Sequence, residues 1–187
     1  VYLPPINGRT YVIGADSAEG NPTSDDSAAV VLDRVSGEEA ASLTGKFQPA
    51  VLAAHCDRIG MWYNRAKVLG ERNNHGHTVI RVADKDLHYS RLYWHDERDR
   101  TLNQIKGQLD PTKRIGWPTT AQTRPGLIDD LAEVILSYSL VSYDVQFWSE
   151  CMSFVVDSSG KSAAAPGAWD DTVMAVAIAR KPKLPTR

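Results

Sequence analysis

Four acidic residues lie where the sequence predicts that secondary-structure elements begin or end. Asp16 closes the β-branched segment TYVIGAD, and Glu71 follows the glycine that ends a short apolar segment. Asp170 and Asp171 come directly before the apolar run of the last predicted helix. Acids at the ends of neighbouring strands and on the first turn of a packing helix would converge on one edge of a sheet. Because clustered carboxylates repel one another, such a group persists only when cations neutralise it, and oxygen ligands select hard ions such as Mg²⁺ or Mn²⁺.

These acids would support phosphodiester chemistry if they converge. Two divalent ions about 3.5–4 Å apart can activate a water molecule and stabilise the leaving oxygen of an in-line displacement, without a nucleophilic side chain. Taken singly, each acid has a simpler interpretation, because Asp is common in turns after strands and at the N-cap of helices. The hypothesis of a metal site therefore depends on the acids occurring together.

The elements that must position these acids begin with three strands. Residues 10–16, 27–33 and 40–45 are rich in β-branched and small apolar side chains. A turn-rich segment separates the first two, and a turn around Gly37 separates the last two. This order predicts consecutive antiparallel strands.

Helices and further strands follow. Apolar residues at helical spacing predict helices at 49–64, after Thr123 and from Asp170 onward, and short strands are predicted at 66–69 and 78–82. Residues 87–118 lack clear periodicity and are predicted as a loop or β-ribbon excursion. The order indicates an α/β fold, in which three antiparallel strands and then parallel strands form a mixed central sheet flanked by helices.

Bulk properties restrict the function classes. A chain of 187 residues fits a single domain, here residues 1–187, and a net charge of −2 excludes binding of nucleic acid through overall positive charge. No apolar stretch of about 18 residues and no signal-peptide pattern occurs, so we expect a soluble protein that is not secreted and needs no membrane. The two cysteines are too few for a disulfide scaffold.

Four segments, in this order, resemble the C-terminal nuclease domain of phage large terminase subunits, which has an RNase H-like fold. They are YVIGADSAEG with the following DDSAAVVLD, then VLGERNNHG, GWPTTAQTRPGLIDDLAE and GAWDDTVMAVAIA. The resemblance covers nearly the whole chain. It implies an endonuclease that cuts double-stranded DNA during genome packaging by two-metal-ion hydrolysis with Mg²⁺ or Mn²⁺.

The resemblance also implies roles for the acids. Asp16 and Glu71 would be catalytic metal ligands, and the final helix would supply Asp170, Asp171 or both. We favour Asp171 as the direct ligand, with Asp170 as N-cap or helper, although a shared role stays open. Trp169 stands where the family often has His, so no imidazole is expected at that position.

The resemblance further implies a larger assembly in the host cytoplasm. Large terminases carry an ATPase domain before the nuclease, whereas this sequence has no G-x-x-x-x-G-K-[ST] motif. The chain would then be a C-terminal part whose residues 1–9 are a linker remnant and whose residues 181–187 are a tail. Its partners would be double-stranded DNA, the ATPase domain of the same subunit, the portal and the small subunit.

Candidate DNA contacts are basic. Arg124 in the segment TRPG suits either a DNA phosphate or a neighbouring carboxylate, and the simpler alternative is a solvated residue beside a capping Thr123. The excursion combines basic and aromatic residues, as expected for a surface that grips a DNA backbone, although its aromatics would equally pack it onto the sheet. Its candidate contacts are Arg91, Arg98, Arg100, Lys106 and Lys113.

Other polar residues near the acids have two interpretations. His75 and His77 have the spacing of neighbours on one face of a strand and would assist metal or phosphate binding, or else belong to a solvated turn. Glu19 and Asp25 or Asp26 would reach the site from a loop, although exposed turn acids are the simpler interpretation.

Two other function classes compete with the nuclease. A non-catalytic RNase H-like module would bind nucleic acid and use the acids only as caps and turns. An actin-like or sugar-kinase-like ATPase would also place an Asp at the end of its first strand, but its phosphate loop needs more glycine than the single Gly20 of SAEGNPTSDD.

Overall fold

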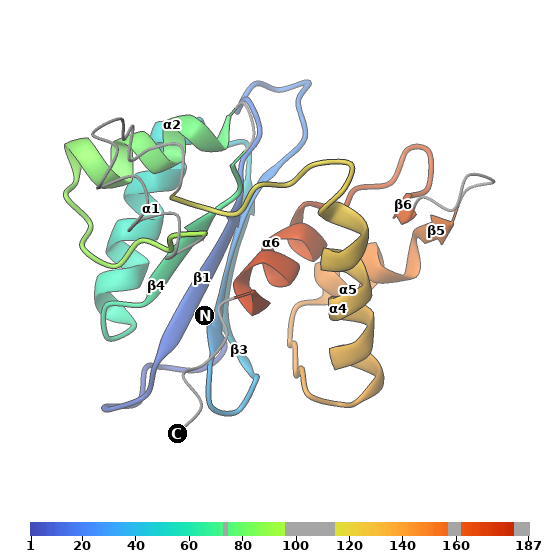
Figure 1. Ribbon diagram of the computed structural model, residues 1–187, viewed down its shortest axis with the longest axis horizontal. Coiled ribbons are helices and arrows are strands. Elements are labelled where there is room, and N and C mark those ends of the chain that lie inside the picture. Colours follow the sequence, from blue (N-terminus) through green and yellow to red (C-terminus); the bar gives the residue numbers. More distant parts are fainter. Residues whose placement is uncertain (73–74, 96–114, 157–161, 182–187) are drawn as a thin grey trace, which may run out of the picture.

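The computed structural model describes residues 1–72, 75–95, 115–156 and 162–181. At its centre is a four-stranded sheet in the order β3-β2-β1-β4 (Figure 1). The antiparallel strands are β1 (Tyr11–Asp16), β2 (Ser27–Asp33) and β3 (Glu39–Gly45), and β4 (Lys67–Gly70) pairs with β1 in parallel. The predicted α/β class with a mixed sheet is therefore confirmed.

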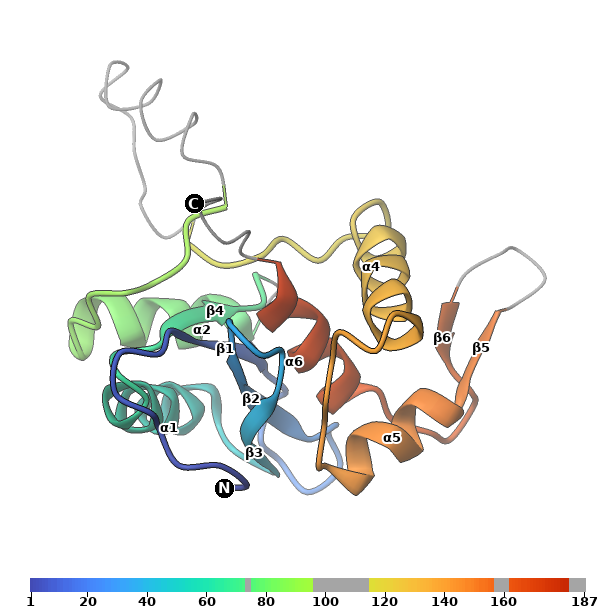
Figure 2. The same ribbon diagram turned by 90° about the horizontal axis from the view of Figure 1, so that it is seen from below.

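Helices cover both faces of this sheet (Figures 1 and 2). On one side lie α1 (Pro49–Trp62), α2 (Gly76–Arg81) and the π-helical turn η1 (Val82–Asp86). On the other side α6 (Asp171–Arg180) packs on β1 and β2, with α4 (Arg124–Leu136) and α5 (Val145–Met152) beyond it. No helix among the described residues is both long enough and apolar enough to cross a membrane.

The central strands are buried on both faces, so they divide the core into two layers. In β1, Tyr11 and Ile13 belong to the layer under α1, whereas Val12 belongs to the layer with α6. This alternation follows from the two-residue period of a strand. It explains why β1 and β2 are nearly continuous apolar runs rather than alternating apolar and polar ones.

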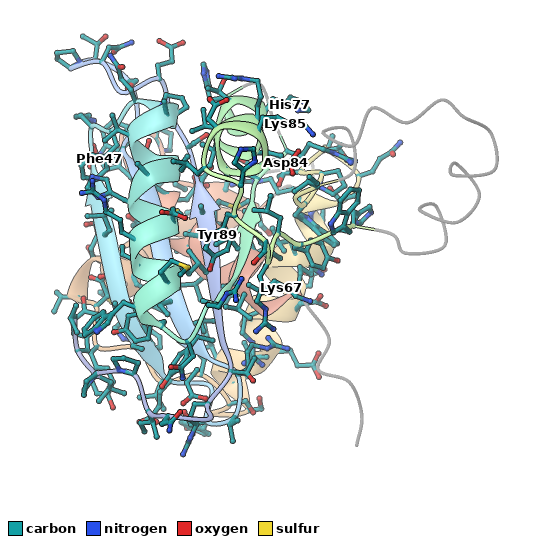
Figure 3. The ribbon with its side chains drawn as sticks, turned by 90° about the vertical axis from the view of Figure 1, so that its left-hand side faces the viewer. Phe47, Lys67, His77, Asp84, Lys85 and Tyr89 are labelled. Carbon is teal, nitrogen blue, oxygen red and sulfur yellow. The ribbon has the colours of Figure 1, made fainter. Side chains whose placement is uncertain are left out.

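The prediction of a strand at residues 78–82 is wrong, because these residues form part of α2 and the start of η1. Val79, Ile80, Val82 and Ala83 are buried, and this spacing is helical. The helix packs against α1 on one side of the sheet (Figure 3). Burial against α1 thus overrides the strand preference of β-branched residues, which depends strongly on context.

Two parts of the fold were not predicted from the sequence. One is α5, and the other is a hairpin of β5 (Phe154–Val156) and β6 (Ser162–Ala164). The described ends of the 87–118 excursion extend the β4 edge through isolated bridges of Val68 with Leu92 and of Glu71 with Trp117. Residues 96–114 of the excursion lie outside the described residues.

The segment 1–9, expected to be a linker remnant, contacts the domain. Its Tyr2 and Leu3 amides donate to the Ala40 carbonyl at 2.9 and 3.0 Å, and Tyr63 Oη donates to the Leu3 carbonyl at 2.7 Å. The single domain, the linker and the tail remain predictions, and most of the tail, residues 182–187, lies outside the described chain.

Candidate metal centre

The structure brings the four acids together at one cavity of about 460 Å³. Asp16 is the last residue of β1, and Glu71 directly follows β4. The parallel pairing of β1 with β4 continues through a hydrogen bond of 2.9 Å from the Glu71 amide to the Ala15 carbonyl. The two acids therefore end neighbouring strands at the same edge of the sheet.

The last helix brings the other two acids to this edge. Asp170 is the N-cap residue of α6 and Asp171 is its first residue. Helix α6 packs over Gly14 of β1, where the helix backbone approaches the strand closely. The N-terminus of α6 and the end of β1 thus meet at the cavity.

Asp16 and Glu71 interact directly. The pKa of Asp16 is raised well above its usual range, chiefly because its carboxyl group is removed from bulk water and then because Glu71 is close and hydrogen-bonded to it. Two neighbouring carboxylates repel each other, so a cation bound between them would be stabilised by both.

Asp171 is buried, with 7% of its surface exposed. Burial, followed by the negative charges of Glu150 and Asp25, raises its pKa to about 7. Its Oδ2 atom is buried and has no hydrogen-bond partner among the described residues, and the same is true of Ser17 Oγ, on another residue that lines the cavity. Because buried polar atoms are rarely left unsatisfied, these two oxygens favour a bound cation or ordered water.

Arg124 also lines the cavity. The sequence left open whether it binds a phosphate or a neighbouring carboxylate, and in the structure it pairs with a carboxylate. Its Nη2 donates to Asp170 Oδ2, and its Nη1 lies 3.3 Å from the sulfur of Met174. The side chains of Arg124 and Asp170 are 23% and 25% exposed. The pair joins the first residue of α4 to the N-cap of α6 and partly neutralises the acidic cluster.

The loop after β1 forms the rim of the cavity. Asn21 Oδ1 accepts hydrogen bonds from the amides of Thr23 and Ser24 at 3.0 and 2.7 Å, which orders the turn. Glu19 and Asp25 line the cavity. Asp26 instead pairs with Lys46 at 2.7 Å, so the two neighbouring aspartates face different partners.

The two histidines are separated by the fold. His75 lines the cavity, with Nε2 3.7 Å from Glu19 Oε1. His77 is exposed on the surface of α2 (Figure 3). The expectation that they share one face of a strand is wrong because this segment is helical, and residues two apart in a helix point in different directions.

Of the basic candidates in the excursion, Arg91 belongs to the part of the chain that the structure describes. Arg91 is exposed and is not among the residues that line the cavity. The remaining candidates, Arg98, Arg100, Lys106 and Lys113, lie outside the described residues.

Glu150 of α5 was not singled out from the sequence. It is buried, with 6% of its surface exposed, and it bonds to the first turn of α6. The sequence gives little indication of this role, because Glu150 lies in the mostly apolar segment FWSECM without a recognisable motif.

The donors at the cavity are carboxylate oxygens, one of them from Asp170, which is paired with Arg124. Carboxylate oxygens suit a hard divalent cation. In their present positions, however, no three His, Cys, Asp or Glu side chains of the described ranges are placed to hold an ion. The structure thus assembles the donors around one cavity without completing a coordination shell.

The fold of this chain is similar to solved structures of phage proteins. No protein-family model matches the sequence, and no curated protein does. The cobalt-bound large terminase nuclease of the thermophilic phage G20c matches with a TM-score of 0.64 and 19% identity, covering 95% of this chain and 83% of that one. Its magnesium-bound form matches with a TM-score of 0.62, 19% identity and the same coverage. The large terminase nuclease domain of Thermus phage P74-26 matches with a TM-score of 0.58 and 21% identity, covering 94% of this chain and 80% of that one.

The sheet order, the flanking helices and these matches define an RNase H-like fold. More specifically, the chain has the fold of the nuclease domain of phage large terminases. The resemblance in the sequence is therefore confirmed for the fold.

Proposed function

We propose that the protein is a metal-dependent nuclease that hydrolyses phosphodiester bonds of double-stranded DNA. One observation carries the proposal: Asp16, Glu71, Asp170 and Asp171, from two strands and one helix, line the same cavity. The solved structures with a similar fold are of large terminase nucleases, and they include forms with bound cobalt, magnesium or zinc.

Two Mg²⁺ or Mn²⁺ ions are the proposed cofactors, with Asp16, Glu71 and Asp171 as ligands and Asp170 as ligand or helper. When bound, such ions lower the pKa of a water molecule and stabilise the charge on the leaving oxygen. At least one carboxylate rotates on binding, because no three acids within the described ranges are placed around one point.

The residues of the chain have distinct proposed roles. Asp16 and Glu71 bind cations, whose positive charge offsets the repulsion between these two neighbouring carboxylates. Asp171 offers the unsatisfied Oδ2 atom. Arg124 holds Asp170 in place through their ion pair, and its remaining guanidinium donors are suited to a phosphate oxygen of the substrate.

The cellular setting extends the same proposal. The domain would act in genome packaging in the host cytoplasm, joined to an ATPase domain and working with a portal and a small subunit. Its support is the fold alone, since identity to the terminase nucleases is about 20%.

Cleavage of supercoiled plasmid DNA tests the proposal. We expect nicked and linear products with Mn²⁺ or Mg²⁺, none with excess chelator, and none from Asp16→Asn or Asp171→Asn. Asp129→Asn, at an exposed position of α4, is the matched control and should cut normally. Cleavage that survives both site substitutions would rule out the assigned centre.

A non-catalytic DNA-binding module is the second candidate, and the incomplete coordination shell favours it. It predicts that a labelled duplex is bound equally with and without Mn²⁺, with no cleavage under any condition. Fluorescence anisotropy beside the plasmid assay separates the two candidates.

A further inference from the structure

The N-terminus of α6 is capped in an unusual way. Its N-cap residue, Asp170, makes no side-chain cap hydrogen bond, although Asp is among the best N-cap residues. The Asp170 carboxylate is instead paired with Arg124 of α4. The amides of the first turn of α6 therefore need another acceptor.

Glu150 of α5 is that acceptor. Its Oε2 atom accepts from the Thr172 amide at 2.8 Å, the Val173 amide at 3.1 Å and Thr172 Oγ1 at 2.5 Å. Its Oε1 atom accepts from Gln146 Nε2 at 2.9 Å. All four donors surround a buried side chain, so the carboxylate has a single well-defined position.

The helix that carries Glu150 is itself fixed at its start. Asp144, the N-cap residue of α5, accepts from the Gln146 amide at 2.9 Å. Gln146 in turn holds Glu150, one helical turn later. A chain of hydrogen bonds thus runs from the start of α5 to the start of α6.

We propose that Glu150 is a positioning residue for the metal centre. By capping α6 from another helix, it leaves the Asp170 carboxylate available to Arg124 and keeps Asp171 directed into the cavity. This inference rests on the proposed function, because positioning matters only if Asp171 is a ligand.

If Glu150 is removed, Asp170 can take its place as the acceptor for the α6 amides. With Glu150→Ala, the amides of Thr172 and Val173 lose their acceptor. Asp170 is the nearest replacement, because an N-cap side chain ordinarily accepts from the second or third residue of its helix. Turning inward to do so, Asp170 would leave Arg124, and the first turn of α6 would shift together with Asp171.

Glu150→Gln provides the conservative variant. The glutamine oxygen replaces Oε2 as acceptor for α6, and a flip of the Gln146 amide presents an oxygen to the new NH₂ group. All the hydrogen bonds are retained while the charge is removed. Glu133→Ala, at an exposed position of α4, is the control for loss of a helical glutamate.

The first measurement is amide hydrogen exchange of Thr172 and Val173 without metal. We expect exchange about fivefold faster in Glu150→Ala, as for loss of an N-cap, and near wild type in Glu150→Gln and Glu133→Ala. The second is Mn²⁺ affinity by calorimetry, where Glu150→Ala should bind about tenfold more weakly and Glu150→Gln should recover most of the affinity.

Several results would overturn the inference. One is unchanged exchange together with unchanged Mn²⁺ affinity in Glu150→Ala. Another is an equal loss of affinity in Glu150→Ala and Glu150→Gln with exchange unaltered, because the charge of Glu150 alone would then explain the loss. If Glu150→Ala does not fold, retention of both exchange protection and affinity in Glu150→Gln supports positioning by hydrogen bonds, and loss of both refutes it. If the wild type binds no Mn²⁺, the proposed function fails, while the exchange measurement still decides whether Glu150 caps α6.

Discussion

A methyl group on Gly14 would lie 2.0 Å from the carbonyl oxygen of Ala175. It would also lie 2.6 Å from the Ala179 amide nitrogen. The backbones of strand β1 and helix α6 are therefore in direct contact, and only glycine at position 14 permits this close an approach. Because β1 ends at Asp16 and α6 begins at Asp171, the spacing of two proposed ligands depends on a residue with no side chain.

Replacing Gly14 should disturb both the fold and the site. We expect Gly14→Ala to lower the free energy of unfolding by about 3 kcal/mol, the upper end of overpacking costs, because the crowded atoms belong to backbone and cannot rotate away. Mn²⁺ binding should weaken as α6 moves outward. Urea denaturation and calorimetry measure the two effects.

Gly126 is the matched control for this substitution. It lies in α4 with nothing within 4 Å of an added methyl group. We expect Gly126→Ala to stabilise the protein by about 0.5–1 kcal/mol, because alanine is the better helix residue. Equal stability of the two variants would contradict the close packing of β1 on α6.

Removing Arg124 should expose repulsion within the acidic cluster. In metal-free protein at pH 8, Arg124→Ala should lower the free energy of unfolding by about 1–3 kcal/mol, because the Asp170 carboxyl group loses its partner. The deficit should shrink at saturating Mn²⁺, since cations then neutralise the same carboxylates. Thermal unfolding with and without Mn²⁺ is the measurement.

The surface pair of Arg81 with Asp86 is the control for Arg124. Its side chains are 54% and 51% exposed, so Arg81→Ala should change stability by less than about 1 kcal/mol, with or without metal. A deficit in Arg124→Ala that Mn²⁺ leaves unchanged would argue against a cation at the cluster.

Asp171→Asn should separate stability from metal binding. Because the pKa of Asp171 is raised to about 7, its charge at pH 8 opposes folding in the absence of metal. The variant should then be more stable than wild type by about 1–3 kcal/mol in chelator, and should gain nothing from Mn²⁺. Equal Mn²⁺-induced shifts in melting temperature for both proteins would show that Asp171 is not a ligand.

Glu39 should make stability depend on pH. It is fully buried in β3, where Ser142 Oγ donates to its Oε2 and burial is the chief cause of a pKa raised to about 7. Between pH 4.5, the ordinary pKa of a glutamate, and pH 7, the Glu39 carboxyl group loses its proton in the unfolded chain but keeps it in the folded one. The contribution of Glu39 to stability therefore falls over this range and stays low above pH 7.

Glu39→Gln isolates this contribution from other carboxyl groups. The stability of wild type relative to the variant should fall by up to about 3 kcal/mol between pH 4.5 and 8, from about 1.4 kcal/mol per pKa unit. Denaturant unfolding at several pH values measures the difference. Parallel curves for the two proteins would contradict a raised pKa.

Local sequence is enough to predict the strands that end at the first two acids and the helix that begins at the others. Residues 10–16 and the run after Asp171 have periods and end residues that leave little choice of structure, so β1 and α6 were predicted almost to the residue. Local preference and burial agree in these segments.

Contacts between elements distant in the sequence account for the other features. Residues 78–82 have strand preferences, yet they form a helix because α1 buries them. Arg124 had two possible partners in the sequence, and the approach of α4 to α6 selected Asp170. Glu150 lies 22 and 23 residues before the two α6 amides that donate to it, and nothing local indicates that contact. Side-chain chemistry and periodicity are local properties that can be derived from sequence, whereas the partner of a buried charge depends on which elements the whole core brings together.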